Sequence, residues 1–243
     1  MSKPLPLPGT LNRWPRRASA ASLLILAFGF TLASAQRKDS PAALQPDKGK
    51  FALLVDGKSM GQEEFEIAPS GAGWLARGTT TIKTEKGDTK VTGSLTLQSD
   101  GAPVSYDWTA QTDKTNGAHI LFANGTAKIT LEMQGSRPYE QDLSFGTPLV
   151  VVLDNNLYHQ YAVLARIYDW SKGGAQQLPV LIPQELTPGS ITLESTGSAS
   201  AGGKTYQALK VTTSDVEILL LLDSKHKLMR IEVPAAKVSV VRE

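Results

Sequence analysis

The sequence predicts a mainly β fold, a curved antiparallel sheet or half-barrel of hairpins with one covering α-helix at about residues 154–170. Three observations support this prediction. Apolar and polar residues alternate with a period of two over most of the chain after residue 50, as in strands with one buried face. Glycine-containing turn pairs interrupt the alternation at short intervals. One segment alone spaces its apolar residues clearly as a helix does.

Residues 1–35 have the pattern of a secretory signal peptide. A basic, acid-free start precedes an apolar run at residues 18–32, and Ala33-Ser34-Ala35 supplies an A-x-A cleavage signal. We favour the general secretory route, because Arg16-Arg17 lacks the continuation of a twin-arginine signal. The apolar run is shorter than the ~20 residues that span a bilayer. We therefore expect an exported protein, periplasmic or secreted, that does not span the membrane.

The composition excludes several classes of site and partner. The chain has no cysteine, so it has no disulfide, no lipid-modified cysteine and no thiolate metal site. Cleavage after residue 35 would remove four of the 25 basic residues and none of the 23 acidic ones, leaving 21 against 23 and a net charge of about −2. Binding to nucleic acid or to an anionic membrane would need clustered cations. We expect no nucleic-acid partner.

The segment after the signal peptide predicts a spacer followed by one domain. Residues 36–48 are polar, contain proline and lack periodicity, which favours a disordered spacer. Residues 49–243 fit a single β-rich domain, because all-β domains often reach this length as one unit.

The first strands follow one another as hairpins. Residues 127–134 place all their apolar residues on one face, and residues 91–98 alternate in the same way. Asn-Gly and Asp-Gly pairs tolerate the positive φ of tight turns, so we expect consecutive strands to pair as a meander. Such hairpins argue against a nucleotide-binding βαβ fold. The expected turns are Asp56-Gly57, Gly71-Ala72-Gly73, Lys86-Gly87-Asp88, Asp100-Gly101, Asn116-Gly117, Asn124-Gly125 and Gly202-Gly203.

The helix follows the β-like residues 149–153. Asp154 is a plausible N-cap, because its carboxylate could accept from the first free amides of the helix. Leu157, Tyr161, Leu164 and Tyr168 form one apolar stripe, and the glycines within residues 171–174 end the helix. In a chain that is otherwise β, we expect this stripe to cover the concave face of the sheet.

Four further strands are expected after the helix, at residues 205–214, 216–222, 227–233 and 237–242. Residues 218–222 are continuously apolar. This run predicts a strand that is covered on both faces.

A second side of the helix carries the first candidate binding residues. His159 and Arg166 lie there with Val163 and Trp170. Two interpretations stay open. The side is either a solvated flank with an exposed histidine, or His159 and Arg166 join Asn155 and Asn156 in a cleft that binds a polar head group.

Glu63 is the second candidate. It shares a strand face with Phe65, whereas Glu64 and Glu66 lie on the opposite, solvent-facing side. A carboxylate on the apolar side needs a partner, and Arg77 in the next expected strand could supply one. Glu63 and Arg77 are then either a structural ion pair or part of a ligand site.

No catalytic or metal site is predicted. Gly57-Lys58-Ser59-Met60-Gly61 matches the nucleophile elbow of hydrolases, but it lies between two expected strands and so indicates a hairpin turn. His119, His159 and His226 lack the paired spacing of metal ligands. We therefore expect a protein that is not an enzyme and uses no cofactor.

Three short motifs carry a family resemblance: Gly61-x-Glu63-x-Phe65, Leu153-Asp154-Asn155-Asn156, and the run from Leu222 to Ile231. With them, the chain resembles a secreted bacterial β-rich domain of unknown function, found alone or ahead of α/β-hydrolase domains. The resemblance implies an accessory module without the enzyme. The architecture is also distantly similar to periplasmic lipoprotein-carrier folds, a likeness that carries no function.

The leading functional expectation is a non-enzymatic envelope or secreted protein that binds a lipid or another hydrophobic molecule in the concave face of its sheet. The alternative for that face is a filled core, as in a sandwich. A second function is a scaffold that offers an open sheet edge, or the segment Leu178–Pro183, to an envelope protein. A third is a hydrolase acting through dispersed residues such as His159, Asp154 and Glu63, or through Ser59.

Overall fold

The computed structural model describes residues 44–243 except residues 86 and 113. Residues 1–35 and residues 36–43, which hold the expected signal peptide and most of the expected spacer, lie outside this part of the chain. The first strand begins at Asp47, two residues before the expected start of the domain. Among the described residues, no helix has the length and hydropathy needed to cross a membrane.

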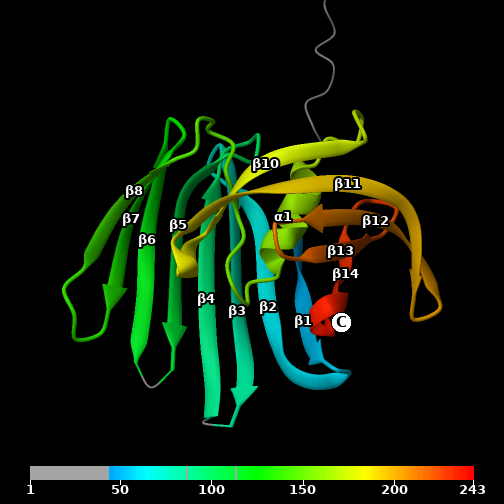
Figure 1. Cartoon of the computed structure of the whole chain (residues 1–243), viewed down its shortest axis with the longest axis horizontal. Helices are drawn as coiled ribbons and strands as arrows, with labels where there is room; N and C mark the ends of the chain where they lie inside the picture. The colour runs from blue at the N-terminus through cyan, green and yellow to red at the C-terminus, as the bar shows by residue number, and fades with distance from the viewer. Residues whose placement is uncertain (1–43, 86, 113) are drawn as a thin grey trace, which may run out of the picture. The chain divides into compact units, whose positions relative to one another are not determined.

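The described residues form one open, curved sheet of 15 strands with one α-helix, as the sequence predicts (Figure 1). Two short 3-10 turns accompany them. The elements are β1 (Asp47–Val55), β2 (Lys58–Ser70), β3 (Gly73–Thr84), β4 (Gly87–Leu97), β5 (Pro103–Gln111), β6 (Thr115–Ala123), β7 (Thr126–Met133), β8 (Tyr139–Ser144), β9 (Val151–Val152), α1 (His159–Ile167), β10 (Ala175–Ile182), η1 (Pro183–Glu185), β11 (Thr187–Ala201), β12 (Lys204–Thr212), β13 (Glu217–Leu222), β14 (Leu228–Val233), η2 (Pro234–Ala236) and β15 (Val238–Arg242).

The sheet has two arms that meet where the first and last strands pair. Strands β1 to β8 form the N-terminal arm and β9 to β15 the C-terminal arm, and each arm is a meander in chain order. Every pair is antiparallel except β9 with β10. Asp47 of β1 accepts two hydrogen bonds from the guanidinium of Arg242 in β15, at 3.1 and 2.5 Å, and this guanidinium lies over the rings of Phe51 and Phe65. This pair joins the first and last strands of the chain, where the two arms meet.

Most expected hairpins are confirmed, but the turn expected at Asn116-Gly117 is wrong. Asn116 and Gly117 lie inside β6, and the chain reverses between the end of β5 at Gln111 and the start of β6 at Thr115. A Cβ on Gly117 would approach the carbonyl oxygen of Trp108 to 2.7 Å. The glycine therefore permits a close approach of two strands, which a turn-based interpretation of Asn-Gly misses.

The helix is confirmed but is shorter than expected. It begins at His159 and ends at Ile167, and residues 154–158 form a turn before it. Asp154 is not the N-cap; that position belongs to Tyr158, which makes no side-chain capping hydrogen bond. The Asp154 carboxylate accepts hydrogen bonds from other parts of the chain instead.

Helix α1 lies between the two arms and packs against β3 and β14 (Figure 1). We call the face of the sheet toward α1 the inner face and the opposite one the outer face. Inner-face residues of both arms and of α1 form a single hydrophobic core. Of the two alternatives for the concave face, the described residues show the filled core. Fully buried members include Phe51, Leu95, Ile120, Leu157, Leu164, Leu193 and Leu220.

The expectation that β13 is covered on both faces is confirmed. Leu220 and Leu222 are buried in the core, and Leu221 on the opposite face is only 1% exposed. The continuous apolar run thus reflects burial on both sides of one strand.

Candidate functional site

The six predicted binding residues do not meet at one opening. Asn155 is exposed and Asn156 half-buried in the turn before α1, while Arg166 is half-buried in the last turn of the helix. Burial lowers the pKa of the Arg166 guanidinium, against the opposite influence of nearby Asp47 and Asp223. His159 and Glu63 are both fully buried, so the interpretation of an exposed histidine on a solvated flank is wrong.

Glu63 needs a partner, as expected, but its partner is not Arg77. His159 Nδ1 lies 2.6 Å from Glu63 Oε1, and the backbone N–H of His159 donates to Oε2 at 2.9 Å. Arg77 points to the outer face and pairs with Glu66. Side chains on neighbouring strands can pair only if they project from the same face of the sheet. Glu63 projects from the inner face and Arg77 from the outer face.

Gly78 makes room for this buried pair. A Cβ at that position would lie 2.4 Å from His159 Nδ1 and 2.5 Å from Glu63 Oε1. The neighbouring glycine in the sheet, Gly93, is paired with Gly78 and gives the same room to Leu157. These two paired glycines therefore let Leu157 and His159, at the start of the helical segment, pack directly against β3 and β4.

A second buried polar group fixes the turn before the helix. Tyr106 donates its hydroxyl to Asp154 Oδ2 at 2.8 Å, and the backbone N–H of Gln184 donates to Oδ1 at 3.0 Å. The side-chain oxygen of Gln160 accepts from the backbone N–H of Asp154. Burial raises the pKa of Asp154 to about 6, although these hydrogen bonds act in the opposite direction.

These buried groups attach α1 to the sheet and are closed to a substrate. Glu63 and His159 are 0% exposed and Asp154 is 5% exposed. His159 Nε2 and Gln160 Nε2 have no hydrogen-bond partner among the described residues, and both are buried. The cluster therefore has the composition of an acid–base site without the access that one needs.

Two hollows lie on the outer face of the N-terminal arm. One has a volume of about 590 Å³ and spans β5 to β7; another, of about 470 Å³, spans β2 to β5. Both are lined by Asp107 and Thr109, so they adjoin. We call the combined feature the outer groove.

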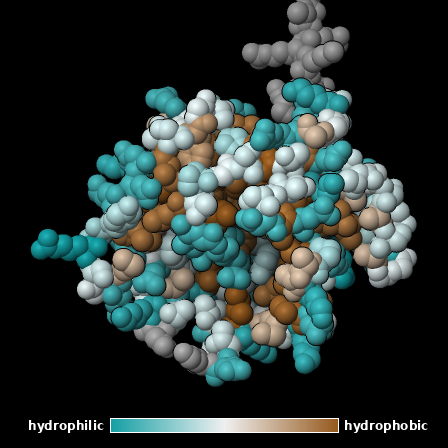
Figure 2. Space-filling model, viewed as in Figure 1, coloured by the Kyte–Doolittle hydropathy of each residue, from teal (hydrophilic) through white to brown (hydrophobic). Residues whose placement is uncertain are grey.

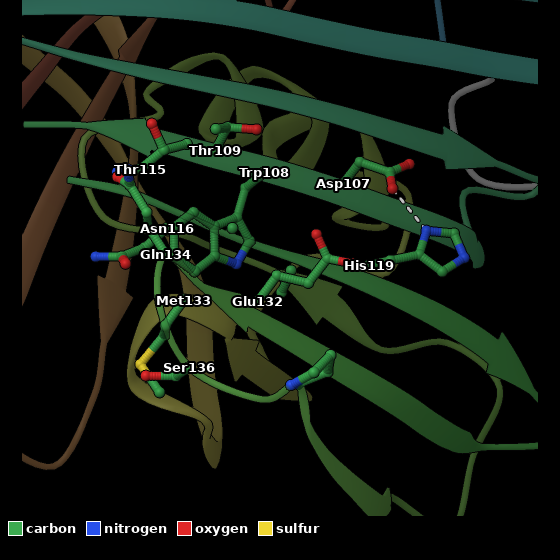
Figure 3. Close-up of a pocket in the computed structure, with 13 residues that line it drawn as sticks. Asp107, Trp108, Thr109, Thr115, Asn116, His119, Glu132, Met133, Gln134 and Ser136 are labelled. Atoms are coloured by element: carbon green, nitrogen blue, oxygen red, sulfur yellow. Dashed lines mark hydrogen bonds and ion pairs between the residues drawn. The ribbon is translucent and has the colours of Figure 1, made fainter.

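The outer groove is polar. Two ion pairs lie within its lining, Arg77 with Glu66 and His119 with Asp107, and Glu64 of the lining pairs with Lys50 beside it. Figure 3 shows the His119–Asp107 pair, with 2.6 Å between His119 Nδ1 and Asp107 Oδ1, beside Glu132 of the next strand. Glu132 has no ion-pair partner among the described residues. Hydroxyl groups complete the lining, from Thr79, Thr92, Ser94, Thr109 and Ser136.

Sequence reasoning missed the outer groove because the β5–β6 turn was misplaced. Asp107 and His119 are direct cross-strand partners only when the chain reverses between Gln111 and Thr115. A turn at Asn116-Gly117 shifts the register and separates them. The signal that could have found this pair is the alternation of Tyr106 and Trp108 with Asp107 and Thr109, which already places the last two on the outer face.

The remaining motifs show no catalytic arrangement in the described residues. Ser59 is the second residue of β2 after the two-residue turn Asp56-Gly57, so the hairpin interpretation is confirmed. The three histidines lie apart, with His226 stacked on Trp170 at 3.9 Å between ring centroids. No group of three or more His, Asp or Glu side chains in the described part is placed to hold a metal ion.

Comparison with known proteins identifies a similar fold and no family. No protein-family model matches the chain, and no curated protein does either. It is similar to the crystal structure of a beta-barrel-like protein of the domain of unknown function DUF1849 from Brucella abortus, with a TM-score of 0.53 and 11% identity over 82% of this chain and 95% of that one. A DUF1089 family protein from Pseudomonas aeruginosa gives a TM-score of 0.47 and 11% identity over 74% of this chain and 91% of that one.

The likeness to the DUF1849 protein shows the fold alone. It supports the resemblance to a bacterial β-rich domain of unknown function. Secretion and the link to α/β-hydrolase domains stay predictions from the sequence.

Proposed function

We propose that this protein is a non-enzymatic, exported binding domain whose ligand is hydrophilic and lies in the outer groove. The observation that carries the proposal is the contrast between the two faces of the N-terminal arm. The inner face is filled by α1 and core side chains, whereas the outer face carries two adjoining hollows of about 590 and 470 Å³. A lipid in the concave face would have to displace the helix, so we place the ligand outside.

The lining defines the class of ligand. Threonine and serine hydroxyls can donate and accept hydrogen bonds, and they suit a ligand rich in hydroxyl groups. Glu132 offers a carboxylate that no described side chain neutralises, which favours an amine on the ligand. We therefore propose a ligand that combines hydroxyl groups with at least one ammonium group.

One observation bears on the proposed non-enzymatic role, and another supports export. The Asp107–His119 pair is open to solvent, and among the described residues no serine or threonine hydroxyl is hydrogen-bonded to the ring. The signal-like pattern of residues 1–35 supports export to the periplasm or beyond the cell. An envelope partner would be a natural consequence of that location.

A trimer of glucosamine, which carries both groups, tests the proposal. In an NMR titration we expect shifts of the amides of Asp107, Thr109 and His119, and Glu132→Gln should weaken binding by about tenfold, the value of one charge-assisted hydrogen bond. The N-acetylated trimer lacks the ammonium groups and should bind the wild-type protein more weakly. Glu194→Gln, on the other arm, is the matched control and should bind as the wild type does. Shifts confined to inner-face residues, or none at millimolar trimer, would contradict the proposal.

A further inference from the structure

Strand β8 forms one edge of the sheet. It pairs with β7 and is the first strand in the sheet order, so its other side has no neighbouring strand among the described residues. The opposite edge, β9, consists of Val151 and Val152, and both are buried. Among the described strands, only β8 therefore offers an edge several residues long.

The hydrogen bonds of the β7–β8 hairpin show which backbone groups of β8 are free. The N–H of Phe145 donates to the carbonyl of Gly125 at 2.8 Å, and Ser144 is the cross-strand partner of Thr126. Hydrogen-bonded and non-hydrogen-bonded pairs alternate along an antiparallel ladder. Leu143 and Gln141 therefore point their backbone groups toward β7. The N–H and C=O groups of Glu140, Asp142 and Ser144 point toward the open edge.

The side chains along this edge differ sharply between its two faces. Glu140 and Asp142 project on the outer face, because they alternate with the inner-face residues of β8. Leu143 and Tyr139 project on the inner face, where Leu131 of β7 is half-buried beside them. Tyr139 is 49% exposed and Met133 42% exposed. In Figure 2, hydrophobic residues reach the surface on the side where Figure 1 shows β6 to β8.

We propose that the β8 edge binds an extended segment of a partner protein as an added antiparallel strand, in which lysine or arginine alternates with apolar residues. The basic residues would lie opposite Glu140 and Asp142 on the outer face, and the apolar residues would extend the surface of Tyr139 and Leu143. Strand β7, on the paired side of β8, has the same alternation of basic and apolar residues. Lys128 is the cross-strand partner of Asp142, and Ile129 is the partner of Gln141.

A second copy of the chain does not fit this edge. Antiparallel pairing of two β8 strands about Gln141 would place Glu140 of each copy opposite Asp142 of the other, and like charges directly opposite are destabilising. The short, buried β9 gives no complementary edge. The acidic edge therefore favours a basic partner over a second β8 strand in this register.

A capped peptide that copies residues 126–131 with a lysine in place of Thr130, Thr-Ala-Lys-Ile-Lys-Leu, tests the proposal. Its lysines would stand opposite Asp142 and Glu140. Upon binding we expect the amides of Glu140, Asp142 and Ser144 to exchange hydrogen more slowly, because these three change from free to bonded. Methylation of the two lysine backbone nitrogens should abolish binding. The same methylation at alanine and isoleucine, whose N–H groups would point away, should leave it unchanged.

Charge substitutions supply the control on the protein. E140K/D142K should lower the affinity for this peptide by at least about tenfold, if each charged pair contributes as cross-strand pairs do. The same variant should instead bind a peptide in which both lysines are replaced by glutamate. E194K/E217K changes the net charge equally on the other arm and should have no effect. Equal binding by both double variants, protection at other amides, or no peptide binding at millimolar concentration would overturn the proposal. This edge is separate from the outer groove, so E132Q should leave peptide binding intact.

Discussion

Glu63→Ala is expected to lower the free energy of unfolding by about 3–5 kcal/mol, because it leaves two buried polar groups of His159 without a partner, at about 1–3 kcal/mol each. Glu63 and His159 are both 0% exposed, and the carboxylate accepts from the ring and from the backbone N–H of His159. Alanine would leave these groups without a partner in a dry site and would detach the first turn of α1 from β2. Urea unfolding at neutral pH measures the change.

Glu66→Ala is the matched control on the same strand. Its side chain is 41% exposed and pairs with Arg77 at the surface, where such pairs contribute at most about 1 kcal/mol. If the two variants were equally stable, the buried pair would not hold the helix. His159→Ala should destabilise the protein as Glu63→Ala does, and the double variant should cost less than the sum, because the two residues form one unit.

The second large effect is a dependence of stability on pH that arises from Asp154. Burial raises its pKa from 3.8 to about 6 in the folded protein. Between those values the folded state binds more protons than the unfolded state, so stability falls as the pH rises. The contribution of the protonated carboxyl is complete below pH 3.8 and is lost above pH 6. It amounts to about 3 kcal/mol, since one pKa unit corresponds to about 1.36 kcal/mol.

Asp154→Asn isolates this effect, because asparagine does not titrate. The difference in free energy of unfolding, wild type minus variant, should decrease between about pH 4 and pH 6 and stay constant above that range. Unfolding of both proteins in urea across this range gives the difference directly. A difference that is constant, or that grows with pH, would show that the folded protein does not bury Asp154 as the structure has it.

The strands were predictable because each needs only local information. The alternation in residues 91–98 and 127–134 shows which side chains are buried whatever the strand pairs with, and turn pairs such as Asn124-Gly125 mark where a hairpin reverses. The pattern also showed that Glu63 lies on the buried side. The pairing of β1 with β15 was not predictable, because it joins residues almost 200 positions apart, such as Asp47 and Arg242.

The partners of the buried polar residues depend on that long-range geometry. Nothing local separates Arg77 from His159 as the partner of Glu63, because the choice depends on which part of α1 seats over Gly78. Asp154 resembles an N-cap in sequence, yet its carboxylate accepts hydrogen bonds from the Tyr106 hydroxyl and the Gln184 backbone N–H. The helix begins five residues further on, at His159. The outer groove depends on the exact register of β5 and β6, which a three-residue error in the turn removes.

We propose that binding takes place on the outside of the N-terminal arm, because the interior is a filled core. Titration with a fluorescent fatty acid, together with the native mass of protein purified without denaturant, tests this claim most directly. We expect the mass of the polypeptide alone and no saturable fatty-acid binding, because α1 occupies the concave face. A lipid that copurifies at one molecule per chain, or a fatty acid that binds at micromolar concentration and is displaced by a second one, would contradict the account.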